Sequence, residues 1–279
     1  MGAVSEMSHL DDNAMNYITA ESRTGYDRRY EDKVFAADTR CIEMVDFVGT
    51  GDQHGVYFCR AESFYRCFAN ATFNGPCIVE IGEFPAEEYD ERGEAITDTR
   101  INMAAAFRNS DLQILPHGCS RYLIDKTNNM FEGCRSLRSW SPAEMIAAGI
   151  AGVDDPQAPR ILKSTGIAQH AFLFNLAPTS MRRMFAGCTA YDGKAVNVIS
   201  WSRLQGERAA EGFAAGCRFA PHFLNAIIAS LHREFFVLRT VTTPLVNVDL
   251  GAGRVTGQTA QQAADLIDAG IQLTGFEIA

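Results

Sequence analysis

The 279-residue sequence predicts an α/β fold, in which short helices and short strands repeat along the chain as an irregular solenoid with an atypical α/β cap at each end. Three observations predict it. Five segments share an aromatic residue followed closely by a small one, short runs of alternating apolar residues follow some of them, and the two ends lack the pattern. A unit this short cannot bury its apolar face alone, so neighbouring units must stack on one another.

The repeated segments each begin with a phenylalanine and reach a small residue three or four positions later. Their phenylalanines are Phe68, Phe107, Phe131, Phe185 and Phe213. The small residues stand at 71, 110, 134, 188 and 217, so the spacings are 39, 24, 54 and 29 residues. Two spacings fall between about 20 and 29 residues, which is typical of leucine-rich repeats, and 54 corresponds to two units of about 27. The spacing of 39 requires an insertion.

The flanks of the third and fourth segments predict what one unit contains. Ser180 precedes Met181 and Met184, a hydroxyl cap followed by apolar residues one turn apart, which predicts a short helix before the Gly-Cys turn. Alternating apolar residues over 137–141 and 196–202 predict short strands after it. Each unit is therefore expected to be a short helix, a turn and a short strand.

The two best-preserved copies are Met130-Phe131-Glu132-Gly133-Cys134-Arg135-Ser136-Leu137 with a following Trp140, and Met184-Phe185-Ala186-Gly187-Cys188-Thr189-Ala190-Tyr191 with a following Trp201. They resemble the BspA-type leucine-rich repeat, a family of bacterial surface proteins and of some phage and protist proteins. The resemblance covers about residues 61–222, although the spacing is irregular and 141–178 show no clear unit. It implies a curved solenoid for binding or display, with no catalytic residues to transfer. The structural repeat positions are Phe68, Phe107, Phe131, Cys134, Trp140, Phe185, Cys188, Trp201, Phe213 and Cys217.

The remaining residues predict two caps. Residues 1–60 are expected to form an acidic N-terminal cap or attachment region, with a helix over 8–18 and strands over 41–48 and 55–59 joined by a glycine-rich turn. Residues 223–279 are expected to form a C-terminal α/β cap. It contains an apolar helical stripe from Phe223 to Phe235, a helix that Thr259 opens as a capping box and Gly270 closes, and strands within 237–250 and 271–278.

The charge balance excludes some partners. The chain has 25 Lys and Arg against 34 Asp and Glu, a net charge of −9, and residues 1–100 alone hold 20 acidic against 9 basic residues. A nucleic-acid partner is not expected, because neutralising phosphates needs clustered Lys and Arg. The sequence contains no run of 18 apolar residues, so a membrane span is not expected. The basic residues are almost all arginine, which is favoured at interfaces, although genomic composition produces the same bias.

The sequence predicts neither a cofactor nor a metal site. Residues 49–55 nearly spell a dinucleotide loop, but the third glycine is one place late and a predicted strand follows, so a hairpin turn is favoured. The eight cysteines and six histidines show no zinc-ligand spacing. Cysteines at the repeated turns are expected to be small buried residues stacked in register. A Cys–His nucleophile pair stays open, because such partners meet only in space.

We therefore expect a non-enzymatic structural or display protein that uses a repeat solenoid for protein–protein contacts. The favoured setting is a bacteriophage virion, as a capsid decoration or tail-associated protein in contact with other virion proteins, within an oligomer or assembly. No secretory signal peptide is recognisable at the start of the sequence, so synthesis in the cytoplasm is expected. The alternative is a bacterial cell-surface adhesin or host-binding module of the same repeat family. A cysteine-dependent hydrolase is the third hypothesis.

Overall fold

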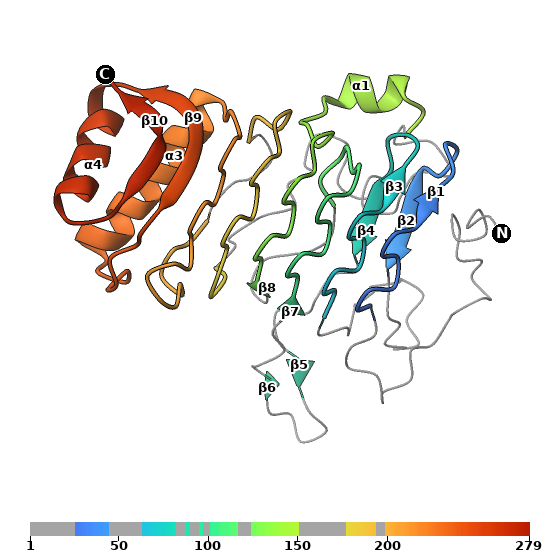
Figure 1. Ribbon diagram of the computed structural model, residues 1–279, viewed down its shortest axis with the longest axis horizontal. Helices are drawn as coiled ribbons and strands as arrows, with labels where there is room; N and C mark the ends of the chain where they lie inside the picture. Colours follow the sequence, from blue (N-terminus) through green and yellow to red (C-terminus); the bar gives the residue numbers. More distant parts are fainter. Residues whose placement is uncertain are drawn as a thin grey trace.

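The computed structural model describes residues 26–44, 63–81, 88–89, 95–96, 101–116, 124–150, 177–193 and 199–279. Its strands are β1 (Val34–Phe35), β2 (Cys41–Met44), β3 (Thr72–Phe73), β4 (Ile78–Ile81), β5 (Glu88–Tyr89), β6 (Ala95–Ile96), β7 (Ile101–Asn102), β8 (Ile124–Lys126), β9 (Val248–Val255) and β10 (Leu273–Ile278). Its helices are α1 (Pro142–Ala147), α3 (Pro221–His232), the π-helix η3 (Arg233–Val237) and α4 (Gly257–Asp268). The predicted mixed α/β class is confirmed. Figure 1 shows the long C-terminal helices at one end of the long axis and β1 to β4 toward the other.

Strand pairing in the described residues is mostly parallel and joins segments far apart in sequence. The parallel pairs are β1 with β3, β2 with β4, β7 with β8, and β9 with β10, whereas β5 and β6 form an antiparallel pair. Strand β2 lies within the predicted strand over 41–48 and pairs with β4. Its predicted partner over 55–59 lies outside the described residues, as does the predicted helix over 8–18. Parallel pairing requires the chain to cross over before it returns, as it does between successive units.

Six eight-residue turns lie beside these strands and share one backbone conformation. We call them the repeat turns; they span 26–33, 64–71, 103–110, 127–134, 181–188 and 210–217. In each, the third and seventh residues have positive φ: the pairs are Arg28 and Asp32, Arg66 and Asn70, Ala105 and Asn109, Asn129 and Gly133, Arg183 and Gly187, and Gly212 and Gly216. The first repeat turn lies well before residue 61, where the repeat region was expected to begin.

Backbone hydrogen bonds join each repeat turn to the next. Alternate N–H groups donate within the turn to the carbonyl three residues back, as Cys134 does to Phe131 at 3.0 Å. The residues between them donate to the following turn, as the N–H of Phe131 does to the carbonyl of Met184 at 2.8 Å. Backbone N–H groups of the turns are thus used either within their own turn or by the neighbouring one, as burial requires.

The predicted short helix at 180–185 is wrong. Arg183 has a φ of +53°, in the left-handed region that an α-helix of L-residues does not tolerate, and the chain forms a repeat turn instead. The predicted strand over 137–141 is also absent from the described structure, where those residues lead irregularly into α1. Strands β7 and β8 precede their repeat turns rather than follow them.

The core between the turns contains a stack of aromatic rings. Tyr30, Phe68, Phe107, Phe131 and Phe185 occupy the fifth position of successive repeat turns, and their ring centroids are 5.0, 5.2, 5.5 and 5.4 Å apart in near-parallel planes. Each unit therefore buries its aromatic ring against the ring of its neighbour. Offset stacking of this kind stabilises a core beyond the area that it buries.

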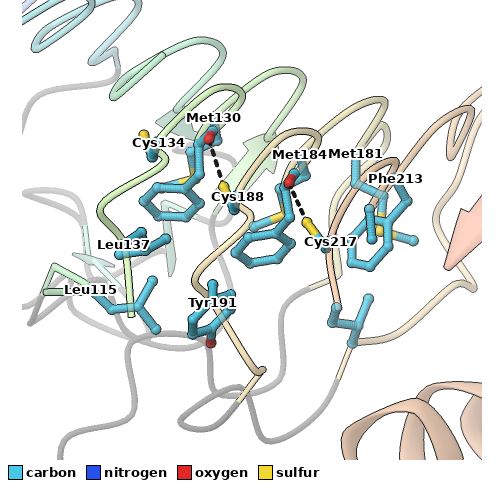
Figure 2. Close-up of a cluster of buried hydrophobic side chains, with 14 of the residues drawn as sticks. Leu115, Met130, Cys134, Leu137, Met181, Met184, Cys188, Tyr191, Phe213 and Cys217 are labelled. Carbon is cyan, nitrogen blue, oxygen red and sulfur yellow. Dashed lines mark hydrogen bonds between the residues drawn. The ribbon is translucent and has the colours of Figure 1, made fainter. Parts of the chain in front are cut away.

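The stack ends at the sixth repeat turn because Phe213 stands one residue earlier than the other rings. The N–H of Phe185 donates to the carbonyl of Phe213, just as the N–H of Phe131 donates to the carbonyl of Met184. Phe213 is thus the equivalent of Met184, and Ala214 is the equivalent of Phe185. The ring of Phe213 meets that of Phe185 edge to face, at 85° and 5.6 Å. Figure 2 shows Phe213 at the end of this buried row. The sequence has one more residue between Phe213 and Cys217 than between the other rings and their cysteines, because Phe213 takes the fourth position of its repeat turn and not the fifth.

The C-terminal cap packs two helices against β9 and β10. Helix α3 buries the expected stripe, with Phe223, Leu224, Ile227, Ile228 and Leu231 inside, and continues into η3. Helix α4 crosses between the parallel strands β9 and β10. It begins at Gly257, before the predicted capping box at Thr259, and Gly270 follows it with a φ of +93°. The N–H of Ala214 donates to the carbonyl of Asp249 at 2.8 Å, which joins β9 to the last repeat turn.

Candidate interaction surface

The outer edge of the repeat turns carries a recurrent arrangement of one glutamate between two arginines. The three glutamates are Glu31, Glu132 and Glu211, each 12–21% exposed. Their arginines are Arg28 and Arg66 for the first, Arg108 and Arg183 for the second, and Arg182 and Arg208 for the third. Four of the six pairs join different turns. Arginines that composition alone would assign to an interface therefore hold this chain's own turns together.

A second row occupies the left-handed seventh position of the repeat turns. The amide of Asn70 donates to Asp32 at 2.9 Å, and that of Asn109 donates to Asn70 at 3.4 Å. The next three turns have glycine at this position. Gly187 lies close to Gly133, since a Cβ added to Gly187 would be 3.5 Å from the Gly133 backbone. Asparagine and glycine are the residues that adopt this conformation most readily. The surface changes along the row from side-chain amides to bare backbone.

The cysteines at the eighth position form a buried row of hydrogen-bond donors. Cys134 donates to the carbonyl of Phe107 at 2.9 Å, Cys188 to that of Phe131 at 2.9 Å, and Cys217 to that of Phe185 at 2.7 Å. Figure 2 draws such bonds as dashed lines. All three thiols are at most 1% exposed. Each thiol thus ties its own turn to the ring residue of the turn before it.

The acid–base chemistry of these thiols disfavours a nucleophile. Burial raises the pKa of Cys134 to about 12. The pKa of Cys188 is also raised, by its hydrogen bond with Cys217 and by burial. A catalytic cysteine needs the opposite, a lowered pKa in a positively charged, accessible setting. Burial also raises the pKa of Cys77 to about 12. Cys77, Cys134 and Cys188 therefore do not support the cysteine-hydrolase hypothesis.

We expect the repeat-turn thiols to resist labelling and to make the fold sensitive to alkali. Unfolded Cys134 ionises near pH 9 but folded Cys134 only near 12, so the stability that it contributes is complete below pH 9 and is lost as the pH rises from 9 toward 12. Peptide mapping after treatment with a thiol reagent near pH 8 should find Cys134 and Cys188 modified only when denaturant is present. A Cys134→Ser variant keeps a donor to Phe107 and should lose part of the alkaline sensitivity. Rapid labelling of either thiol in the folded chain would contradict this assignment.

The two tryptophans lie in different parts of the core. Trp140 is half-buried before α1, donates from Nε1 to the carbonyl of Gln113 at 3.0 Å, and carries the guanidinium of Arg138 3.8 Å above its ring. Helix α1 begins there with a capping box between Ser141 and Glu144, whose hydrogen bonds from Ser141 and Arg138 lower the pKa of Glu144 to about 2. Trp201 is 1% exposed and lies in the main core beside Phe213. The two do not occupy equivalent positions.

A buried carboxylate that the sequence did not point to joins the cap to the segment between the fifth and sixth repeat turns. Glu234, on η3, is 7% exposed and accepts hydrogen bonds from the N–H of Trp201 at 2.8 Å and from the hydroxyl of Ser200 at 3.2 Å. Burial raises its pKa. The one signal in the sequence is a glutamate within the apolar stripe from Phe223 to Phe235, and that signal does not identify its partner.

Two further kinds of site, a metal centre and a membrane span, concern the described residues. No group of three or more His, Cys, Asp and Glu side chains there could hold a metal ion. None of the helices in the same ranges has the length and apolar character needed to cross a bilayer. No family model, no curated protein and no solved structure matches the chain.

Proposed function

We propose that the protein is a non-enzymatic structural or display protein, built as a BspA-like leucine-rich-repeat solenoid and used for protein–protein contacts. The observation that carries the proposal is the recurrence of one backbone conformation in six repeat turns, each hydrogen-bonded to the next. In a solenoid each repeat contacts only its neighbours, which leaves a long surface for a partner.

The use of side chains supports a structural role. The fifth-position rings stack on one another, the thiols donate to carbonyls of the preceding turn, and the three glutamates pair with arginines of neighbouring turns. Groups that could act as nucleophile, acid or electrophile in an enzyme are therefore engaged in holding the turns together. What the repeat turns offer outward is an elongated edge of paired charges, amides and glycines.

We further propose a bacteriophage virion as the setting, as a capsid decoration or tail-associated protein. The buried thiols favour it over the alternative of a bacterial cell-surface adhesin. Cys77, Cys134, Cys188 and Cys217 are free thiols, and all four use their protons as donors to backbone carbonyls. Such a core forms in a reducing compartment, such as the cytoplasm in which virions assemble, whereas an exported adhesin folds under oxidising conditions.

Fractionation of the producing culture tests this setting. Particles banded on a density gradient should contain peptides of this chain at constant stoichiometry, and the chain should leave the particles only under dissociating conditions. A capsid protein followed in the same fractions is the positive control, and a cytoplasmic enzyme of the host is the negative control. Recovery of the chain only as free protein would overturn the virion proposal, and recovery in the envelope fraction would favour the adhesin.

A further inference from the structure

The C-terminal cap exposes three consecutive apolar side chains where η3 ends. Phe236, Val237 and Leu238 are 40, 68 and 49% exposed. The wider π-turn, closed by the N–H of Leu238 on the carbonyl of Arg233 at 2.9 Å, interrupts the α-helical spacing that buries the stripe of α3. Contiguous exposed apolar side chains are uncommon on a monomer and mark contact sites.

Two arginines flank this apolar group without a partner in the described chain. Arg233 and Arg239 are exposed, and no described residue forms an ion pair or side-chain hydrogen bond with either. The arginines of the repeat turns differ in this respect, as Arg108 and Arg183 do in sharing Glu132. The two guanidinium groups beside Phe236 are therefore available to carboxylates of another molecule.

The end of α4 supplies apolar and acidic groups on the same side of the cap. Strands β9 and β10 are parallel, so α4, which crosses between them, ends near where they begin. The contacts of His232 place the end of η3 near α4 as well. The ring of His232 joins them directly, with its Nε2 3.3 Å from Asp265 of α4 and its centroid 4.8 Å from that of Phe236. In the last turn of α4, Ile267 is 41% exposed and is followed by the exposed Asp268, whose carboxylate has no described partner either.

We propose that this surface binds a second copy of the chain in a two-fold symmetric dimer. We call it the cap surface; it consists of Arg233, Phe236, Val237, Leu238, Arg239, Ile267 and Asp268. A two-fold interface must be self-complementary, and the cap surface has an apolar centre with unpaired groups of both signs around it. In the dimer, Arg239 of one copy lies against Asp268 of the other while the apolar groups pack centrally.

The charge of the cap disfavours a lipid bilayer as the occupant. Residues 221–279 hold three arginines, no lysine and five acidic residues, a net charge of −2. Binding to an anionic membrane surface needs a cluster of basic residues, on the order of four to eight. A protein surface that carries both apolar and acidic groups complements the apolar side chains and arginines of the cap surface. The cap surface of a second copy is itself such a surface, since it contains Ile267 and Asp268.

Sedimentation velocity of the full chain, over about 1 to 100 µM, tests the dimer. The wild type should show a concentration-dependent dimer, and Val237→Asp should raise its dissociation constant about tenfold or more, because it places a carboxylate in the apolar centre. Val34→Asp is the matched control, since Val34 is 59% exposed on β1, far from the cap. It should dimerise as the wild type does. Near-UV circular dichroism establishes that each variant is folded.

A charge exchange tests the pairing separately from the apolar contact. Arg239→Asp should weaken the dimer, and it suits the backbone, because Arg239 has a φ of +53° that aspartate tolerates. Adding Asp268→Arg to it should restore association. A wild type that stays monomeric over the whole range, a dimer that Val237→Asp leaves unchanged, or a double variant without restored association would each overturn the proposal. Binding of the wild type, but not of Val237→Asp, to phosphatidylserine vesicles without a dimer would assign the cap surface to a membrane instead.

Discussion

Replacing Phe131 with alanine should lower the free energy of unfolding by about 3–5 kcal/mol. The ring is completely buried and lies between those of Phe107 and Phe185, with centroids 5.5 and 5.4 Å away and planes within 14°. Truncation removes both stacking contacts and leaves a cavity that the backbone cannot close, because Phe131 and its neighbours are held in register by hydrogen bonds to the next turn.

Denaturant unfolding followed by tryptophan fluorescence and by circular dichroism measures this loss. Phe185→Ala should cost a similar amount, and the double variant should be less destabilised than the sum, since the two rings share one contact worth about 0.5–1.5 kcal/mol. Tyr65→Ala is the control, because Tyr65 is an aromatic residue of a repeat turn that is 40% exposed, and it should cost less than about 0.5 kcal/mol. If Phe131→Ala and Phe185→Ala were both silent, the stacked-turn core would be wrong.

The sequence allowed the repeat turns to be located where their aromatic and small residues recur. The Gly-Cys pairs at 133–134 and 187–188 mark the seventh and eighth positions, where a left-handed backbone and a small buried side chain are needed. The stripe of α3 was predictable for the same reason, since each buried position repeats with the period of a helix. Local patterns of this kind reflect constraints that act within a few residues.

Features that depend on a distant partner could not be predicted. The turn at 26–33 escaped notice because it has Tyr30 in place of phenylalanine and Lys33 in place of a small residue, and only its hydrogen bonds to 65–69 reveal it. The pairing of Glu132 with Arg183 spans 51 residues. The short helix expected before Phe185 was wrong because propensity and apolar spacing do not report the φ of Arg183, which the neighbouring turns fix.

The start of β9 shares one feature with the repeat turns, a pair of positive-φ residues, and lies directly against the last of them. Asn247 and Gly251 have φ of +54° and +78°, four residues apart as in the six repeat turns. The N–H of Ala252 donates to the carbonyl of Cys217 at 2.7 Å, directly beside Gly251. A Cβ on Gly251 would lie 2.8 Å from that carbonyl oxygen and 3.2 Å from that of Ala214, and both atoms belong to the backbone of the last repeat turn.

Gly251→Ala should therefore lower the free energy of unfolding by about 3 kcal/mol, combining the strain of a left-handed alanine with the overpacking of the joint. Gly257→Ala isolates the first contribution, because Gly257 has a φ of +57° but no atom within 4 Å of its added Cβ, and it should cost only about 1 kcal/mol. Hydrogen exchange locates the effect: in Gly251→Ala the N–H groups of Gly212 and Ala214, which donate to the carbonyls of Asn247 and Asp249, should lose protection before those of Phe131. Equal costs for the two variants would show that backbone conformation alone matters at Gly251, and that the cap is not held by close contact with the last repeat turn.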